Sequence, residues 1–425
     1  MSKPVRRVLC ISYYHAPEEN PGTRRIAAFA RYLPTHGYQL SVLAANRRGT
    51  LPDDLVQRTL RATDLVSVPA RLLHRSAAAS HAPVVSAESR AARLLRTLLI
   101  PDLHASWLPL ALARGRQVLA SVPFVAIFSS SPPETNHLVA YQLARRSGLP
   151  WIADFRDGWM FEPLNTARLH NPLRRRIELA LEGRVVRQAS ALVTINDEIS
   201  ADLRTRYPGV TVTTIPNGLD TALLASIVHD SAPARSFRLV YTGGLARARS
   251  GTGIEGLLAA FRLLAADHQP IMDDLVFQIA GDLSDAERAP LMQQAGTRVE
   301  ILGRVAHQQA LQLQHDASVL LLVTDPQARA VTTSKIFEYL FSGRPILALT
   351  RSQSVITLVH QHNAGVVVAP DDPAAIARAL ADLHRRWHND DLPTQVHSGV
   401  QRYDRRALTA ELTACFDNVL AQAEH

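Results

Sequence analysis

Short apolar runs alternate along this chain with longer segments of helical periodicity. Near the start, an apolar run at residues 8–12 leads into a polar loop, an apolar-periodic helix at residues 26–35 and a second apolar run at residues 40–45. Runs that are apolar on both faces are typical of parallel strands buried between layers of helices. The pattern therefore predicts a β-loop-α-β unit whose helix crosses one face of a parallel sheet.

The alternation continues and divides the chain into two halves. In the first half, we expect further strands at residues 65–68, 125–129, 151–155, 191–195 and 210–215, with helices at 135–147 and 174–188. In the second half, strands are expected from Arg238 and at residues 275–281, 299–303, 319–323, 346–349 and 365–368. We therefore predict an α/β fold of two doubly wound domains, residues 1–217 and 218–400. We expect a final helix within residues 401–425. It packs either against the second domain or, by crossing back, against the first.

Residues 332–349 are expected to form a helix, a turn at Gly343 and a strand. Three hydroxyl residues ending in Ser334 precede the helix, and Lys335 and Glu338 fall on one face of its first turn. A cation and free N–H groups suit a phosphate, whereas a carboxylate suits ribose hydroxyls. The pair is therefore a candidate nucleoside-diphosphate site, although a solvated Lys beside a capping Glu has the same spacing.

Composition and length restrict the class of protein. The chain has 425 residues, of which 47% are hydrophobic and 20% charged, as expected of a globular protein with two or three domains. The first apolar run is too short for a signal peptide, and no run reaches the ~18 apolar residues of a membrane span, so we expect a cytoplasmic protein. Cys10 and Cys415 lack metal-ligand spacing and are interpreted as reduced core residues.

The net charge of +8 and the pI of about 9.9 favour anionic partners, such as nucleotides or an anionic membrane face. Much of the positive charge lies between residues 70 and 117, in Arg71, Arg75, Arg90, Arg93, Arg96, Arg114 and Arg116. If helical, this stretch is a basic amphipathic surface for a membrane; otherwise it is a solvated loop and helix. Nucleic acid is disfavoured because only 6% of residues are aromatic and none are interleaved with the basic ones.

Polar residues follow two of the predicted strands of the first half. Gly22 and Thr23 lie in the loop after the first strand, although no G-x-G-x-x-G motif is present. The loop at residues 129–134 opens a helix with His137 in its first turn. We interpret His137 either as a catalytic group or as a helix residue bonded to Glu134.

A third loop combines charges with an aromatic residue. Asp154, Arg156, Asp157 and Trp159 follow the strand that begins at residue 151. Charged groups at the carboxyl end of a buried parallel strand often belong to a binding site. The alternative is an internal Arg156–Asp157 ion pair covered by Trp159 as a packing lid.

Several of these segments, in this order, resemble the GT-B glycosyltransferases and, more narrowly, the retaining family 4 group. The segments that carry the resemblance are YYHAPEENPGTRR, SSSPPETNH, WIADFRDGW, IPNGLD, YTGG and SKIFEYLFSGRPILAL. The resemblance covers essentially the whole chain. It implies two Rossmann-like domains that face a central cleft.

The resemblance also implies roles for individual residues. Gly243 and Gly244 let the backbone approach the donor diphosphate, and Glu338 holds the donor ribose. The segment lining the base is Gly303, Arg304 and Val305. The loop with Gly22 and Thr23 faces the sugar and the acceptor.

Three positions depart from the family pattern. Ala330 stands where the first of two paired glutamates is expected, and Arg156 stands where many members carry a His. The Arg-x4-Lys clamp after the first strand of the second domain is absent. We expect Arg247 or Arg249, together with Lys335, to neutralise the diphosphate instead.

These observations predict a retaining glycosyltransferase that moves a hexosyl or N-acetylhexosaminyl group from a nucleotide-diphospho-sugar to an acceptor hydroxyl, without a metal or a cofactor. Asp154 or Asp157 orients or deprotonates the acceptor, with His137 as the alternative. The acceptor is a glycan, a lipid-linked intermediate or a small molecule, met in the cytoplasm or at the inner membrane face. Rival interpretations are a GT-B nucleotide-sugar epimerase, a phosphorylase-like enzyme, or a catalytically silent subunit of another transferase.

Overall fold

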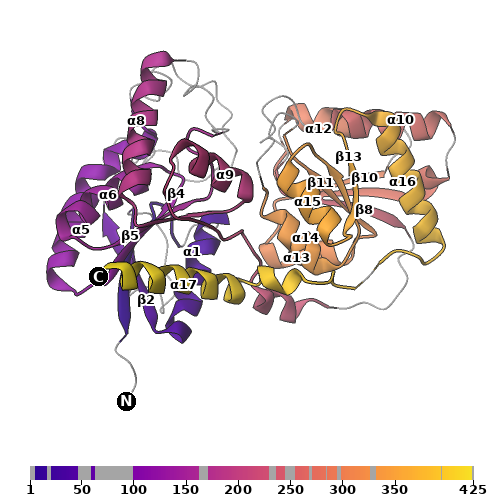
Figure 1. Ribbon diagram of the computed structural model, residues 1–425. Helices are drawn as coiled ribbons and strands as arrows, with labels where there is room; N and C mark the ends of the chain where they lie inside the picture. The colour runs from indigo at the N-terminus through magenta and orange to yellow at the C-terminus, as the bar shows by residue number, and fades with distance from the viewer. Residues whose placement is uncertain are drawn as a thin grey trace, which may run out of the picture. The chain divides into compact units, whose positions relative to one another are not determined.

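The computed structural model describes residues 5–16, 21–45, 59–62, 99–161, 171–228, 236–244, 254–267, 270–283, 285–293, 298–325, 332–393 and 395–423. The described residues form two compact units. Unit 1 contains the residues up to Pro216 together with those from Leu408 onward, and unit 2 contains Asn217–Ala407. Each unit is a parallel sheet covered by helices (Figure 1), which confirms the predicted α/β class.

Unit 1 is built on a seven-stranded parallel sheet in the order β3-β2-β1-β4-β5-β6-β7. Its strands are β1 (Arg6–Ile11), β2 (Tyr38–Ala45), β3 (Thr59–Ala62), β4 (Ala126–Ser131), β5 (Trp151–Phe155), β6 (Ala191–Thr194) and β7 (Val212–Thr214). Its helices are α1 (Pro21–Tyr32), α5 (Leu108–Ser121), α6 (Thr135–Ser147), α8 (Pro172–Gln188), α9 (Asp197–Arg206) and most of α17 (Arg405–Ala423), with short 3₁₀ helices at Leu33–His36 and Leu103–Trp107. The strand order reverses between β1 and β4, where open α/β sheets bind ligands.

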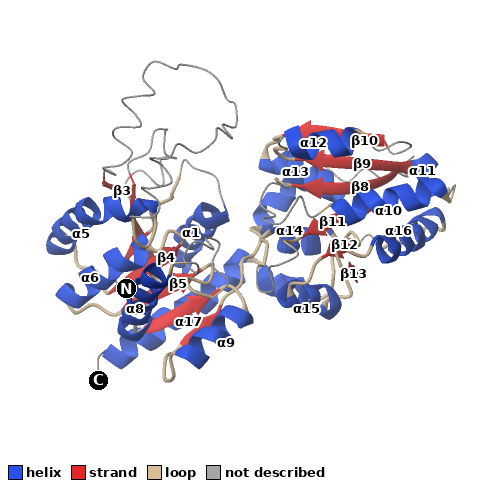
Figure 2. Ribbon diagram, turned by 90° about the horizontal axis from the view of Figure 1, so that it is seen from above, coloured by secondary structure: helices blue, strands red, loops and turns tan. Residues whose placement is uncertain are grey.

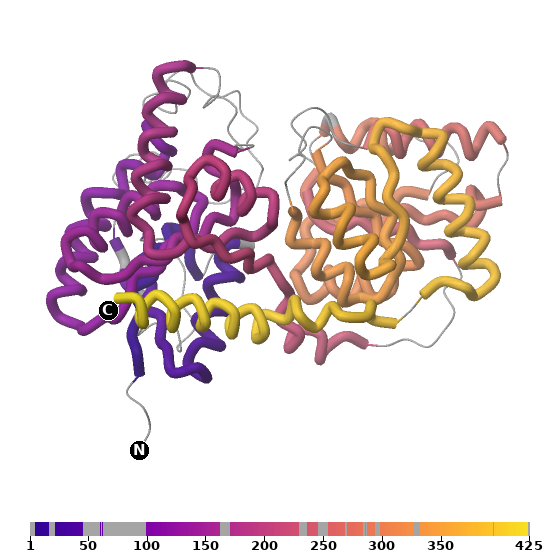
Figure 3. The backbone as a smooth tube through the Cα atoms, viewed as in Figure 1, coloured from indigo at the N-terminus to yellow at the C-terminus, as the bar shows by residue number. Residues whose placement is uncertain are grey.

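The last helix completes the core of unit 1. Leu412 and Phe416 of α17 lie in one buried cluster with Val8 and Phe128 of the central strands. The ring centroids of Tyr38 and Phe416 are 5.3 Å apart. Figure 3 traces this helix, in yellow, alongside the indigo segments of the same unit.

Unit 2 is a second parallel sheet, of six strands in the order β10-β9-β8-β11-β12-β13 (Figure 2). Its strands are β8 (Phe237–Thr242), β9 (Leu275–Ala280), β10 (Arg298–Gly303), β11 (Val319–Val323), β12 (Ile346–Leu349) and β13 (Gly365–Val368). Its helices are α10 (Glu255–Ala266), α11 (Ile271–Asp274), α12 (Asp285–Met292), α13 (His307–His315), α14 (Lys335–Ser342), α15 (Gln353–Gln361) and α16 (Pro373–His388), with 3₁₀ helices at Thr221–Ser226 and Val400–Tyr403. The order reverses between β8 and β11, so loops at the carboxyl ends of these strands are placed to hold a ligand.

The two ends of unit 2 are joined to each other. Leu219 forms an isolated parallel bridge with Asp404. The Leu219 N–H donates to the carbonyl of Tyr403 at 3.1 Å, and the Arg405 N–H donates to the carbonyl of Leu219 at 3.0 Å. The chain therefore enters and leaves unit 2 at neighbouring positions.

Two expectations from the sequence need correction. The first helix begins at Pro21 rather than at residue 26, because proline suits the first position of a helix, and this places Gly22 and Thr23 in its first turn. The sheet has a strand at Thr59–Ala62, which the apolar pattern did not indicate because TLRA is a short edge strand with polar positions. The strand expected at residues 65–68 lies outside the described residues. None of the described helices is both long and apolar enough to span a membrane.

Candidate functional site

The carboxyl ends of β8 and β9 pass close to each other in unit 2. The N–H of Gly243 donates to the carbonyl of Ala280 at 2.7 Å, and Gly243 has a φ of +117°. A Cβ on Gly281 would lie 2.2 Å from the Gly243 oxygen, and a Cβ on Gly243 would lie 2.3 Å from the Nζ of Lys335. Only glycine fits this turn, because it must accept both the positive φ and the lysine side chain.

Lys335, the first residue of α14, is held beside that turn. Its Nζ donates to the Tyr241 hydroxyl at 3.1 Å and lies 4.6 Å from the centre of the Tyr241 ring. The Tyr241 hydroxyl in turn donates to the carbonyl of Gly244 at 3.1 Å. The Lys335 N–H donates to Thr333 Oγ1 at 3.4 Å, and Ser334 makes no side-chain cap. A cation, a glycine turn and a helix N-terminus therefore meet at one point, which suits a diphosphate.

Glu338 lies one turn further along α14, and side chains of α13 hold it. The Nε2 of His307 is 3.0 Å from Glu338 Oε1, and the Nε2 of Gln314 donates to Glu338 Oε2 at 2.9 Å. The Glu338 side chain is 11% exposed. It is thus an acceptor fixed on both oxygens. Sequence reasoning missed His307 and Gln314, which lie 31 and 24 residues from Glu338 and carry no motif.

The segment predicted to line a base follows β10. Gly303 has a φ of +67°, and a Cβ there would meet open space. Arg304 is exposed and Val305 is half-buried. Since carboxyl ends of parallel strands share one edge of a sheet, this segment lies on the same edge as Gly243. Arg247, Arg249 and Ala330 lie outside the described residues.

In unit 1, Asp154 of β5 is engaged in a buried ion pair. Its Oδ1 accepts from Arg25 Nη2 at 2.9 Å, and its Oδ2 accepts from Arg25 Nε at 3.2 Å and from Ser130 Oγ at 2.7 Å. The Asp154 side chain is 0% exposed. Arg25 also donates to the carbonyls of Ile215 and Pro216. The carboxylate is thus held below the surface, where it fixes α1 to the sheet.

Arg156 forms a second anchored cation, and the Asp157 charge acts on it together with that of Asp154. Its Nε donates to Ser130 Oγ at 3.0 Å and its Nη2 donates to the carbonyl of Pro132 at 2.8 Å. A Cβ on Gly22 would lie 1.8 Å from Arg156 Nη1, so the guanidinium lies directly against the first turn of α1. Burial lowers the pKa of Arg156 from its ordinary value. Asp157, the next residue, is half-buried.

His137 is enclosed in the core of unit 1. Its Nδ1 lies 2.8 Å from Ser129 Oγ, which also accepts from the Trp151 indole at 2.8 Å. The His137 ring centre is 4.4 Å from that of Phe155. Burial lowers the pKa of His137 to about 4, so the imidazole is neutral at pH 7. Thr23, in the first turn of α1, is also buried.

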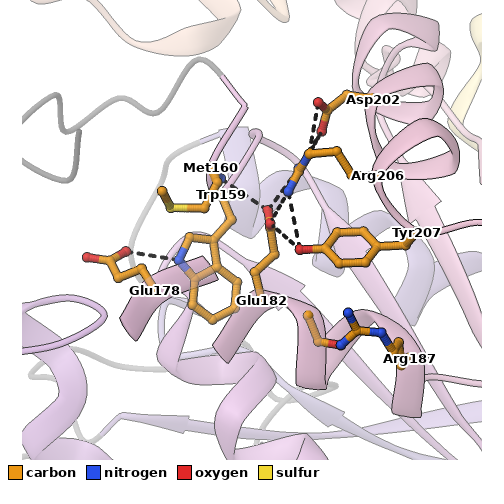
Figure 4. Close-up of polar contacts among 9 residues, drawn as sticks. Trp159, Met160, Glu178, Glu182, Arg187, Asp202, Arg206 and Tyr207 are labelled. Carbon is orange, nitrogen blue, oxygen red and sulfur yellow. Dashed lines mark hydrogen bonds and ion pairs between the residues drawn. The ribbon is translucent and has the colours of Figure 1, made fainter. Parts of the chain in front are cut away.

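Two glutamates of α8 fix the far end of the loop that carries Arg156 (Figure 4). The Trp159 indole donates to Glu178 Oε2 at 3.0 Å, and the Met160 N–H donates to Glu182 Oε1 at 3.1 Å. The figure also shows Arg206 and the Tyr207 hydroxyl reaching Glu182. Both glutamates are buried. The described part of the loop is therefore held by β5 and by α8.

Two family models match the chain in sequence. Residues 22–218 match the glycosyl transferase 4-like domain, and residues 236–386 match the glycosyl transferases group 1. Together the two matches span most of the chain and correspond to its two sheets. The chain belongs to the GT-B glycosyltransferases and carries glycosyltransferase domains in both units.

Solved structures share the fold at low sequence identity. Sucrose-phosphate synthase from Thermosynechococcus elongatus is 17% identical, with 98% of this chain and 97% of that chain covered and a TM-score of 0.59. WaaG, a glycosyltransferase involved in lipopolysaccharide biosynthesis, is 14% identical, with 96% and 99% covered and a TM-score of 0.59. Anabaena HepE, solved in complex with UDP and glucose, is 14% identical, with 96% and 99% covered and a TM-score of 0.58. No curated protein sequence matched the chain.

Proposed function

We propose that this protein is a retaining glycosyltransferase that moves a hexosyl or N-acetylhexosaminyl group from a nucleotide-diphospho-sugar to an acceptor hydroxyl. The observation that carries the proposal is the position of the Lys335 ammonium against the Gly243 turn, with Glu338 one helical turn away. A diphosphate suits the first pair and a ribose suits the carboxylate. The complex of HepE with UDP and glucose supports this class of donor.

The chemistry asked of unit 2 is stabilisation of a leaving group. As the bond between sugar and diphosphate breaks, negative charge grows on the phosphate oxygens. Lys335 and the N-terminus of α14 are fixed in place before that charge develops, so little reorganisation is needed. On this proposal no metal is required, because the protein supplies the positive charge itself.

We assign the acceptor and the reacting sugar to residues of unit 1. Arg156 is a permanent cation and cannot remove a proton, so it orients oxygen atoms of a substrate. Asp157 is the better candidate for orienting or deprotonating the acceptor hydroxyl, because Asp154 is fully buried and paired with Arg25. Asp154 then acts as a positioning residue, and buried His137 supports the β4–α6 region.

The proposal leaves three classes of acceptor: a glycan, a lipid-linked intermediate and a small molecule. It places the reaction in the cytoplasm, with a peripheral contact to an anionic membrane face that the net charge of +8 supports. On α5, Arg114 is half-buried and Arg116 exposed. The other arginines of the basic stretch, Arg71, Arg75, Arg90, Arg93 and Arg96, lie outside the described residues.

A two-stage experiment tests the function. Thermal shift against UDP-, GDP- and ADP-sugars identifies the donor, since a ligand at about 100 times its Kd adds about 2.7 kcal/mol of stability. The chosen donor is then incubated with acceptor extracts, and NMR determines whether the anomeric configuration is retained. An inverted product contradicts the retaining mechanism.

The same incubation separates the rival functions. An altered donor sugar formed without any acceptor indicates an epimerase. Donor cleavage that requires inorganic phosphate indicates a phosphorylase-like enzyme. Donor binding without turnover until a second chain is added indicates a silent subunit. Failure of every nucleotide sugar to bind rejects the proposal.

A further inference from the structure

We propose that Gln314 is the positioning residue that fixes Glu338 for recognition of the donor ribose, and that it thereby sets the preference for ribonucleotides over deoxyribonucleotides. This inference rests on the proposed function, which assigns Glu338 to the ribose. Gln314 belongs to α13 and its side chain is buried, so it acts through Glu338 rather than by touching the substrate.

Both amide hydrogens of Gln314 are used. The Nε2 donates to Glu338 Oε2 at 2.9 Å and to Thr242 Oγ1 at 2.9 Å. A primary amide has only two such hydrogens, so its donating capacity is exhausted by these two contacts. Gln314 thus links the Glu338 carboxylate to the Thr242 side chain at the end of β8.

The orientation of this amide follows from its partners. If the amide were rotated by 180°, its oxygen would face the Glu338 carboxylate, and two acceptors would repel each other. In the observed orientation Oε1 is buried and, within the described residues, has no hydrogen-bond partner. A buried acceptor without a partner destabilises a fold, whereas an apolar side chain of the same length would not. The unpartnered Oε1 of Gln314 therefore lowers the folding stability of unit 2. A role in orienting Glu338 would explain why a glutamine is present at this position.

The second contact of Gln314 connects the ribose site to the phosphate site. Thr242 is the last residue of β8 and directly precedes Gly243. Its N–H donates to the Tyr339 hydroxyl at 3.3 Å, and that hydroxyl donates to the carbonyl of Leu321 at 3.2 Å. Gln314 thus couples Glu338 to the strand end that carries the glycine turn. Glu338, proposed to bind the ribose, and the Gly243 turn, proposed to bind the diphosphate, are therefore held in fixed positions relative to each other.

His307 holds the other oxygen of Glu338, but from a more open position. The side chain of His307 is 20% exposed, whereas Gln314 as a residue is 1% exposed. The interior bond from Gln314 therefore restricts the rotation of the carboxylate more than the outer contact does. On the proposed function Glu338 also accepts from ribose hydroxyls, because a carboxylate oxygen accepts more than one hydrogen bond.

The test compares ribose and deoxyribose ligands on the full chain. The probe is whichever of UDP, GDP and ADP binds the wild-type protein most tightly, together with its 2′-deoxy and 3′-deoxy analogues, measured by isothermal titration calorimetry. We expect Gln314→Met to reduce the ribose-to-deoxyribose affinity ratio about tenfold, the effect of one lost hydrogen bond to a charged group. The melting temperature should change little, because loss of the two hydrogen bonds opposes removal of the unpartnered Oε1.

A double-mutant cycle shows whether Gln314 acts through Glu338. In a Glu338→Gln background, Gln314→Met should change the ratio by less than about twofold, because the two residues act as one unit. Thr242→Val removes the other partner of the amide and should lower the ratio in the same direction. It provides a second measurement should Gln314→Met fold poorly.

The matched control is Gln278→Met. The Nε2 of Gln278 donates to Glu300 Oε2 at 2.8 Å, so the control breaks the same kind of pair within β9 and β10 of the same unit. It should leave the ratio unchanged. Equal losses for ribose and deoxyribose ligands, or additive effects of Gln314→Met and Glu338→Gln, would overturn the inference alone. If Glu338→Gln by itself leaves the ratio unchanged, the proposed ribose contact fails instead.

Discussion

Arg25 and Asp154, 129 residues apart in the chain, form a two-point ion pair that is almost completely shielded from solvent. The pair joins the first helix of unit 1 to the strand whose loop carries Arg156 and Asp157. Both oxygens of Asp154 are occupied, so the proposed function gives the two aspartates different roles. On that proposal Asp154 supports the loop, and Asp157 acts on the acceptor.

Asp154→Asn should therefore act mainly on stability. It leaves the Arg25 guanidinium buried with a neutral partner, and breaking a buried ion pair from one side costs about 3–5 kcal/mol. Urea unfolding measures this loss. The control is Asp371→Asn, which breaks an exposed pair with Arg351 and should cost no more than about 1 kcal/mol. If Asp154→Asn is as stable as the wild type but has lost its turnover, Asp154 has a direct catalytic role.

Asp157→Asn should have the opposite profile. On the proposed function this half-buried carboxylate orients or deprotonates an acceptor hydroxyl, and loss of such help typically lowers kcat by about 10²–10⁴-fold. Donor Kd and melting temperature should change little. The measurement is kcat at saturating donor beside calorimetric donor affinity. Turnover close to that of wild type would move the search for a base to other residues of unit 1.

Gly22→Ala and Arg156→Lys should impair the same step. A methyl group on Gly22 overlaps the Arg156 guanidinium and must displace it, while lysine cannot reproduce the planar fork that reaches Ser130 and Pro132. Each variant should lower kcat, and the double variant should be little worse than the poorer single one. Steady-state kinetics of the three proteins give the comparison. If the losses of kcat from the two single variants multiply in the double variant, the two residues do not act on the same step.

Lys335→Ala should weaken binding of a nucleoside diphosphate by about 1.5–3 kcal/mol, because it removes a charge-assisted phosphate contact. Binding of the matching nucleoside should be nearly unaffected. Calorimetry with both ligands measures the difference, and Arg351→Ala, an exposed cation of unit 2, provides the control. The same loss for nucleoside and diphosphate would show that Lys335 does not contact phosphate.

Activity should survive chelation. The proposed mechanism neutralises the diphosphate with Lys335 and the N-terminus of α14, so excess EDTA should leave kcat within about twofold of its starting value. Assays with and without EDTA, followed by added Mg²⁺, make the comparison. Complete loss that Mg²⁺ restores would contradict the metal-free mechanism.

The sequence predicted the sheets well because parallel strands buried on both faces are continuous apolar runs. The runs at residues 151–155 and 319–323 correspond to β5 and β11 without a shift. The edge strand β3 was missed because TLRA lacks such a run. Helix start at Pro21 was also missed, although proline at a first helical position was the available signal.

The candidate site was predicted less completely, since its partners are distant in sequence. The sequence could place Lys335 and Glu338 together because three-residue spacing puts them on one helix face. Gln314 and Arg25 were not identified as partners, because nothing local distinguishes a buried polar side chain from a solvated one. Glu178 and Glu182 were missed for a related reason: glutamates four apart among arginines are typical of an exposed helix.

The closed ends of unit 2 have a consequence for the order in which the protein is made. All of unit 2, from Asn217 to Ala407, is one continuous stretch, and Leu219 and Asp404 already bring its ends together. Unit 1 is begun first by the ribosome but lacks Leu412 and Phe416 of its core until α17 has been made. Domains usually fold in the order of synthesis. Here we expect the nascent chain to complete unit 2 while one face of the unit 1 sheet is still uncovered. A chaperone could bind that exposed apolar face at this stage.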